Sequence, residues 1–84
     1  MPEILPFHKD ITRYLRKHSI EAAFLKQIGY LKEDPRHPSL RVELLEPRHL
    51  RIYSFRITRR YRAIFIFRQD RTAVEILDVN DHYR

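Results

Sequence analysis

Hydrophobic positions in the first part of the chain recur at helical spacing. From residue 7 to residue 18, apolar and aromatic side chains return every three to four residues, as on one face of an amphipathic helix. These positions are Phe7, Ile11, Tyr14, Leu15 and His18. The remaining arc is basic, with Lys9, Arg13, Arg16 and Lys17. A short strand is expected before it at residues 3–5, and Pro6 confines this strand to a sheet edge because proline lacks an amide hydrogen.

A second helical pattern begins after Ser19, which is a favourable residue for capping a helix amino terminus. Glu21 in the first turn supports this start, and Pro35 requires the helix to end before it. The predicted apolar face consists of Phe24, Leu25, Ile28 and Leu31. The only glycine of the chain, Gly29, lies inside this pattern at a cost of about 1 kcal/mol relative to alanine. Its position predicts close packing against a neighbouring element.

After a loop at residues 34–39, indicated by its two prolines, the hydrophobic period changes to that of strands. The strand-like runs are residues 40–44, 50–57, 61–67 and 73–79. Connectors of hairpin length at 58–60 and 69–72 predict an antiparallel meander of the last three strands. The run 61–67 is apolar on both faces, as is typical of a central strand. The sequence thus predicts an α+β fold, with two amino-terminal helices packed on a twisted, mainly antiparallel sheet of four to five strands.

Composition limits this fold to one domain. The chain has 84 residues, of which 43% are hydrophobic, enough for a single core spanning residues 1–84. The absence of cysteine excludes a disulfide framework and a thiolate metal site. The amino terminus lacks the basic leader and apolar stretch of a signal peptide, and no apolar run approaches the ~20 residues of a membrane span. We therefore expect a cytoplasmic protein.

Charge points to a polyanionic partner. The 17 lysines and arginines exceed the 11 acidic residues, which gives a net charge of +6 and a pI near 10.1. A domain this small cannot dilute such an excess, so nucleic acid is a natural partner. Arginine dominates the basic residues, and its planar guanidinium suits bidentate phosphate binding better than the ammonium of lysine.

Several motifs follow one another in a characteristic order. After the helix pair and a His-Pro loop come a strand with the sequence YSFRI at 53–57, a strand opening with YRAI at 61–64, and the closing residues His82 and Tyr83. In this order they resemble the RelE/ParE superfamily, the toxins of type II toxin–antitoxin systems. The His-Tyr ending is similar to that of the YoeB-like branch, whose members use such a pair to cleave messenger RNA on the ribosome. Arg84 follows the pair here.

The resemblance implies specific roles. Arg56 and Arg62 would lie on adjacent strands and hold the scissile phosphate, and His82 and Tyr83 would act at the end of the last strand. Without the resemblance, the two arginines would be interpreted as the solvated positions of alternating strands. Additional contacts with RNA are expected from the basic residues Arg51, Arg59, Arg60 and Arg84.

A carboxylate completes the set in the YoeB-like branch, and the sequence offers two candidates. Counting back from Arg62 without gaps leads to Glu43, whereas matching the Glu-Pro dipeptide leads to Glu46. The dipeptide match slightly favours Glu46. The glycine that usually precedes the Arg-Ile strand is absent and residues 48–51 stand there instead, so the reach of the carboxylate stays open.

RNA supplies its own nucleophile, the 2′-hydroxyl, so cleavage requires a base, an acid and positive charge around the phosphorus, with no metal or other cofactor. A glutamate could act as base and His82 as acid, because imidazole titrates near neutral pH. Preformed positive charge from the arginines would stabilise the transition state. Tyr83 could stack on a base or orient the phosphate.

The predicted function is that of a toxin that cleaves messenger RNA as a metal-independent endoribonuclease, bound to the ribosome in the manner of the YoeB-like branch. Its partners would be messenger RNA, the ribosome and a cognate antitoxin, with no membrane. Two alternatives stay open: a ParE-like toxin that inhibits DNA gyrase without nuclease activity, and an inactive toxin-like domain that binds RNA. The oligomeric state of the toxin alone is also open.

Overall fold

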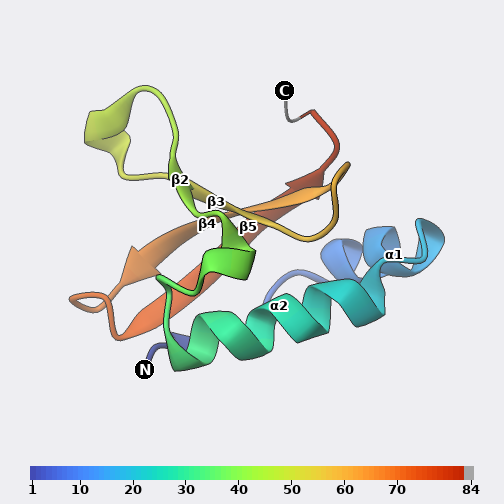
Figure 1. Cartoon of the computed structure of the whole chain (residues 1–84), viewed down its shortest axis with the longest axis horizontal. Coiled ribbons are helices and arrows are strands. Elements are labelled where there is room, and N and C mark those ends of the chain that lie inside the picture. The colour runs from blue at the N-terminus through green and yellow to red at the C-terminus, as the bar shows by residue number, and fades with distance from the viewer. Residues whose placement is uncertain (83–84) are drawn as a thin grey trace.

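The computed structural model describes residues 1–82, which form two helices and one five-stranded sheet (Figure 1). Helix α1 spans Lys9–Lys17 and helix α2 spans Glu21–Glu33. The strands are β1 (Glu3–Ile4), β2 (Glu43–Leu44), β3 (Tyr53–Arg56), β4 (Arg62–Arg68) and β5 (Ala73–Asn80). Two 3₁₀ turns, η1 (Pro38–Leu40) and η2 (Arg48–Leu50), flank β2. No helix within residues 1–82 is long and apolar enough to cross a membrane.

The strand order is β1-β5-β4-β3-β2, so β4 is the central strand, as its apolar sequence predicts. Strands β3, β4 and β5 form the predicted antiparallel meander, and β2 extends it on the outer edge of β3. The opening strand β1 pairs in parallel with β5 at the other edge. The predicted α+β class and the predicted mainly antiparallel sheet are therefore confirmed.

Both helices pack on one face of the sheet (Figure 1). Phe55 of β3 and Phe65 of β4 are fully buried on this face, and their ring centroids are 5.7 Å apart. Phe24 of α2 lies 6.0 Å from Phe55 and joins the helices to the sheet. Phe65 is a core residue, whereas Phe67 is only partly buried and packs against the core. Burial of this apolar surface is the main force that holds the two layers together.

The junction between the helices differs from the prediction. Ser19 does not cap α2, because it adopts a left-handed conformation (φ 57°) in the turn that ends α1. Its N–H donates to the carbonyl of Arg16 at 3.2 Å. The capping position is taken by Ile20, which offers no side-chain hydrogen bond but is buried in the core. Burial of Ile20 thus decides where α2 begins.

The inner face of α2 also differs in part. Phe24 and Leu31 are buried as predicted, but Leu25 is 56% exposed and Gln27 is buried in its place. Gly29 does not permit close packing, since an added Cβ would meet no atom within 4 Å. Leu25 and Gly29 are four residues apart, so they share the outer side of the helix. The end of α2 at Glu33, before Pro35, follows the prediction.

Two predicted strands are shorter than their apolar runs. The run 40–44 pairs only at β2, and the run 50–57 pairs only from Tyr53. The first residue of each run belongs to a 3₁₀ turn that starts near a proline. Both turns end at an arginine in the left-handed region, Arg41 with φ 46° and Arg51 with φ 55°. These conformations rotate the chain out of the extended path that a strand requires.

Candidate functional site

The sheet face opposite the helices carries polar side chains at neighbouring positions. Arg56 lies directly across from Arg62, and Arg62 lies directly across from Asn80. Ser54, on the same side of β3 as Arg56, pairs with Glu43 of β2. Directly opposed residues project to the same face of a sheet. We call these five residues the open-face cluster.

Arg62 is fixed within this cluster. It is only 3% exposed, and burying a guanidinium is costly unless its N–H groups are hydrogen-bonded. Its Nε donates to Ser54 Oγ at 3.0 Å, and its Nη2 donates to the backbone carbonyl of Arg41 at 2.6 Å. The interpretation of Arg62 as a solvated strand residue is therefore wrong, and the cation is held in a defined orientation.

Arg56 is the second cation on this face. Its guanidinium forms no hydrogen bond or ion pair with any residue in the range 1–82, and only its backbone carbonyl is engaged. Like charges directly across a sheet repel each other. An anion that binds between Arg56 and Arg62 would relieve this repulsion, so the pair favours a negatively charged ligand.

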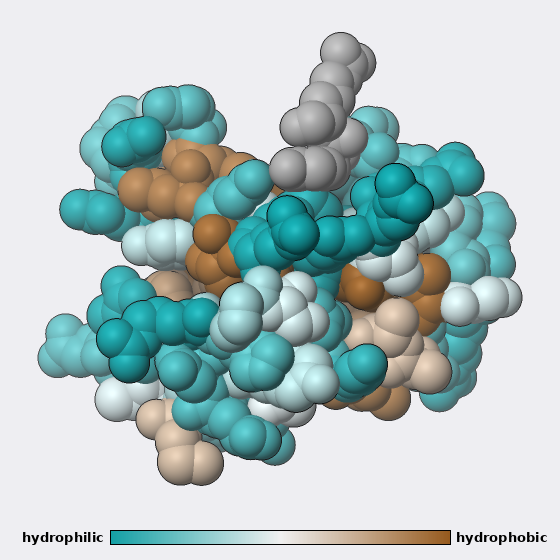
Figure 2. Space-filling model, viewed as in Figure 1, coloured by the Kyte–Doolittle hydropathy of each residue, from teal (hydrophilic) through white to brown (hydrophobic). Residues whose placement is uncertain are grey.

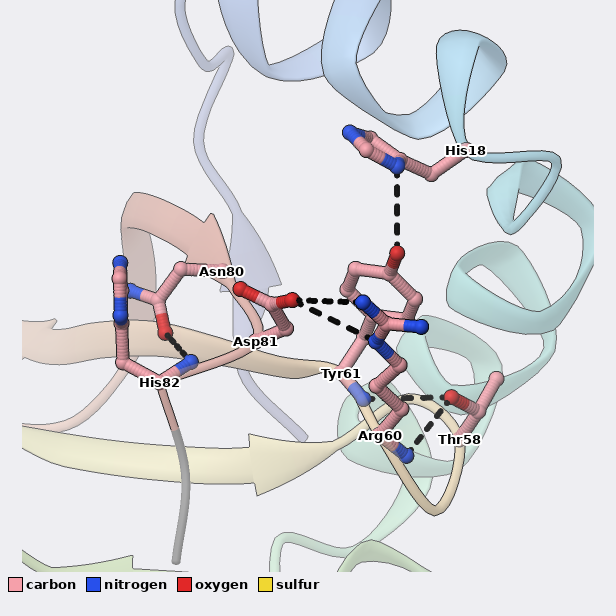
Figure 3. Close-up of polar contacts among 7 residues, drawn as sticks. All are labelled: His18, Thr58, Arg60, Tyr61, Asn80, Asp81 and His82. Carbon is pink, nitrogen blue, oxygen red and sulfur yellow. Dashed lines mark hydrogen bonds and ion pairs between the residues drawn. The ribbon is translucent and has the colours of Figure 1, made fainter.

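The end of β5 brings His82 to the same end of the sheet as Arg56 and Arg62 (Figure 3). Asn80, the last residue of β5, accepts a hydrogen bond from the His82 backbone N–H at 3.1 Å. Asp81 between them accepts from the guanidinium of Arg60, at 3.3 Å from Nη2. Arg60 lies in the β3–β4 turn, where Thr58 Oγ1 accepts from its backbone N–H. The chain leading to His82 is thus tied to the turn between the two arginine-bearing strands.

Aromatic residues of α1 support this corner of the molecule. The Tyr61 hydroxyl shares a hydrogen bond with His18 Nδ1 at 3.1 Å (Figure 3). The Tyr14 ring lies 4.2 Å from the His18 ring. Partial burial raises the pKa of Tyr14, and the nearby carboxylate of Asp81 raises this pKa further. The β3–β4 turn and the end of β5 therefore rest against a packed element.

The two candidate carboxylates lie in different places. Glu43 is half-buried on β2 and belongs to the open-face cluster. The side chain of Glu46 is 76% exposed on the β2–β3 connection, 3.6 Å from Nε of Arg48. Figure 2 shows hydrophobic side chains gathered over this connection. Leu50 of η2, which lies in the connection, is 51% exposed. The structure therefore brings Glu43, but not Glu46, next to Ser54.

The other predicted RNA-binding residues are dispersed. Arg59 and Arg60 are exposed in the β3–β4 turn, beside the end of β5. Arg51 is exposed at the end of η2, on the β2–β3 connection. Tyr83 and Arg84 lie outside the described residues.

Sequence reasoning missed Gln27, which anchors one side of the site. This side chain is 5% exposed. Its Nε2 donates to the carbonyls of Arg56 at 2.7 Å and Ser39 at 3.0 Å, and its Oε1 accepts from Ser39 Oγ at 3.1 Å. One signal was available, because position 27 falls between Phe24 and Leu31 on the inner face of α2. A polar residue there must find buried partners.

These features define a small basic domain with a RelE-like α+β fold and a cationic open face. No protein-family model matches the chain, and no curated protein matches it in sequence. Among solved structures, the YoeB/ParE toxin from Agrobacterium tumefaciens is similar, with a TM-score of 0.74 over 99% of this chain and 100% of that chain. The two sequences are 17% identical, so the likeness shows that they share a fold.

Proposed function

We propose that the protein is the toxin of a type II toxin–antitoxin system and that it cleaves messenger RNA on the ribosome without a metal. The observation that carries this proposal is the arginine pair across β3 and β4, with Arg62 buried and fixed and Arg56 without a partner among residues 1–82. The fold shared with a YoeB/ParE toxin supports the toxin role. A cytoplasmic location and inhibition by a cognate antitoxin follow from this role.

In the proposed reaction, the RNA 2′-hydroxyl attacks the adjacent phosphorus and loses its proton to a carboxylate base. The bond from phosphorus to the 5′-oxygen breaks, and this oxygen takes a proton from the imidazolium of His82. The products are a 2′,3′-cyclic phosphate and a 5′-hydroxyl. Arg56 and Arg62 stabilise the negative charge that develops on the phosphoryl oxygens. Each proton transfer contributes about 10²–10⁴-fold in rate.

Glu43 is the better supported base, because it lies across from Ser54, which accepts a hydrogen bond from Arg62. Glu46 is the alternative and would require the β2–β3 connection to approach the RNA. Tyr83 would stack on a base or orient the phosphate, and Arg51, Arg59, Arg60 and Arg84 would add positive charge for the RNA backbone.

The test is primer extension on messenger RNA after brief induction of the wild type and His82→Gln in cells. His49→Gln is the matched control, because His49 is an exposed histidine on the β2–β3 connection. We expect discrete cuts within translated regions that disappear in His82→Gln and persist in His49→Gln. Intact messages with the wild type would contradict the nuclease proposal.

The structural neighbour is a YoeB/ParE toxin, and ParE-like toxins act on gyrase, so gyrase inhibition is the second candidate. Supercoiling by purified DNA gyrase is therefore assayed alongside cleavage by purified ribosomes. Inhibited gyrase with intact messages would move the protein to the ParE-like class. Neither effect, with retained RNA affinity, would indicate an inactive RNA-binding domain.

A further inference from the structure

A hollow of about 580 Å³ opens at the edge of the sheet, between α2, η1 and the end of β3. Strand β2 covers only Tyr53 and Ser54 of β3, so the edge beyond them is not covered by a strand. Lys26 of α2, Arg41 after η1 and Arg56 of β3 all line the hollow. No acidic side chain belongs to the described lining.

The three cations of this hollow have no ion-pair partner within residues 1–82. The side chains of Lys26, Arg41 and Arg56 form no hydrogen bond or ion pair with residues 1–82. Some arginines elsewhere are neutralised, since Arg13, Arg16 and Arg68 each have a carboxylate oxygen at 2.7–3.2 Å. Arg51, Arg59 and Arg71 form no ion pair with residues 1–82, but they do not line this hollow. Positive charge that is concentrated in a concave surface attracts anions more strongly than the same charge spread over the protein.

Arg41 connects the hollow to the open-face cluster. Its left-handed conformation (φ 46°, ψ 52°) is strained for a residue with a Cβ. In this conformation its carbonyl accepts the hydrogen bond from Nη2 of Arg62, while its side chain lines the hollow. One residue thus fixes the buried cation and adds a second cation nearby.

Arg56 continues this connection from the other side. It lies across from Arg62 on the open face and also lines the hollow. Gln27 holds the backbone of Arg56 and that of Ser39, and so keeps β3 and η1 at a fixed separation on the two sides of the hollow. Arg56 therefore belongs both to the open-face cluster and to the hollow that Lys26 and Arg41 line.

We propose that this hollow is a second phosphate-binding subsite, which holds the phosphodiester next to the scissile one on single-stranded RNA. The assignment of the scissile phosphate to Arg56 and Arg62 rests on the function proposed above. The subsite itself requires only a phosphodiester backbone that passes from Arg56 to Arg41 and Lys26. Lys26 and Arg41 contact the neighbouring phosphate, and Arg56 lies between the two phosphates.

The test measures binding of a short 2′-O-methyl oligoribonucleotide to the purified full chain at several salt concentrations. This probe lacks the nucleophilic hydroxyl, so binding is measured without cleavage. The variant Lys26→Gln/Arg41→Gly removes two cations, and glycine retains the backbone carbonyl and suits the left-handed conformation. Lys17→Gln/Lys32→Gln is the control, because it removes the same charge at exposed positions outside the hollow. Thermal unfolding checks that each variant is folded.

We expect the slope of log affinity against log salt concentration to fall by about 0.7 in the hollow variant, because Lys26 and Arg41 hold one phosphate and each phosphate contact on a single strand contributes ~0.7. The control should retain most of the slope. Equal losses in both variants would overturn the subsite and leave the nuclease proposal intact. A loss confined to the hollow variant, with no cleavage by the wild type, would retain the subsite and remove the nuclease proposal. If an oligoglutamate peptide binds with the same dependence on Lys26 and Arg41, the hollow accepts acidic proteins and the RNA assignment is wrong.

Discussion

The two 3₁₀ turns of the molecule have similar sequences but different surroundings. Each begins near a proline and ends with a leucine followed by an arginine, in η1 Leu40 and Arg41 and in η2 Leu50 and Arg51. Both arginines adopt the left-handed conformation. Leu40, however, is fully buried, whereas Leu50 is 51% exposed. Similar local sequences thus produce the same local conformation, and only long-range packing distinguishes the two turns.

The first turn is anchored from several sides. His37 caps η1 by accepting from the Ser39 N–H at 3.1 Å, and its ring stacks on Tyr30 of α2 at 3.9 Å. Gln27 joins the same turn to β3. The second turn has no side-chain cap. The first turn can therefore position Arg62, while the second presents its side chains to solvent or to a partner.

The largest expected effect is on the rate of RNA cleavage. It distinguishes Glu43, at the start of the β2–β3 connection, from Glu46, which lies within the connection. Glu43→Gln should lower RNA cleavage by about 10²–10⁴-fold, because the base can no longer accept the 2′-hydroxyl proton. Glu46→Gln should leave cleavage nearly unchanged. Single-turnover cleavage on programmed ribosomes measures both. The reverse result would assign the base to the second turn and make that exposed loop part of the site.

Packing provides the next comparison. Leu40→Ala should reduce the free energy of unfolding by about 2–5 kcal/mol, since it leaves a cavity in the core. Leu50→Ala should change it by less than about 0.5 kcal/mol, because the side chain is half exposed. Denaturant titration of both variants measures the difference. Similar losses would mean that the second turn is packed in solution and would remove the distinction between the turns.

The anchor of the first turn is tested by Gln27→Ala. This change removes three hydrogen bonds to Ser39 and Arg56, and we expect a loss of about 1–3 kcal/mol in the free energy of unfolding. Ser39→Ala removes only its hydroxyl hydrogen bond to Gln27 and should cost less. Denaturant titration compares the two, and an equal cost would show that the backbone bonds to Gln27 contribute little.

The difference between these turns also explains which parts of the fold and of the candidate site the sequence could predict. Helical and strand periodicity predicted both helices, the meander and the central position of β4, because those elements depend on which side chains face the core. The placement of Arg56 and Arg62 on adjacent strands followed from the family resemblance, and the structure adds that they lie directly across from each other. The burial of Arg62 did not, because its partners include the carbonyl of Arg41, 21 positions away. A backbone carbonyl can accept a hydrogen bond whatever the side chain, so the sequence does not indicate it as a partner. The predictions for Ser19, Leu25 and Gly29 were wrong because tertiary packing overrode local preference.

The smallest expected effect concerns the arginines that end the turns. Arg41→Gly and Arg51→Gly should each raise the free energy of unfolding by about 0.5–1 kcal/mol, since relief of the left-handed strain exceeds the entropic cost of glycine. Thermal and denaturant unfolding measure these gains. A smaller gain for Arg41→Gly would mean that contacts of the Arg41 side chain contribute to folding, which its lack of partners among residues 1–82 argues against. Equal gains, together with weaker RNA binding by Arg41→Gly, would show that the Arg41 side chain contributes to RNA binding and not to stability.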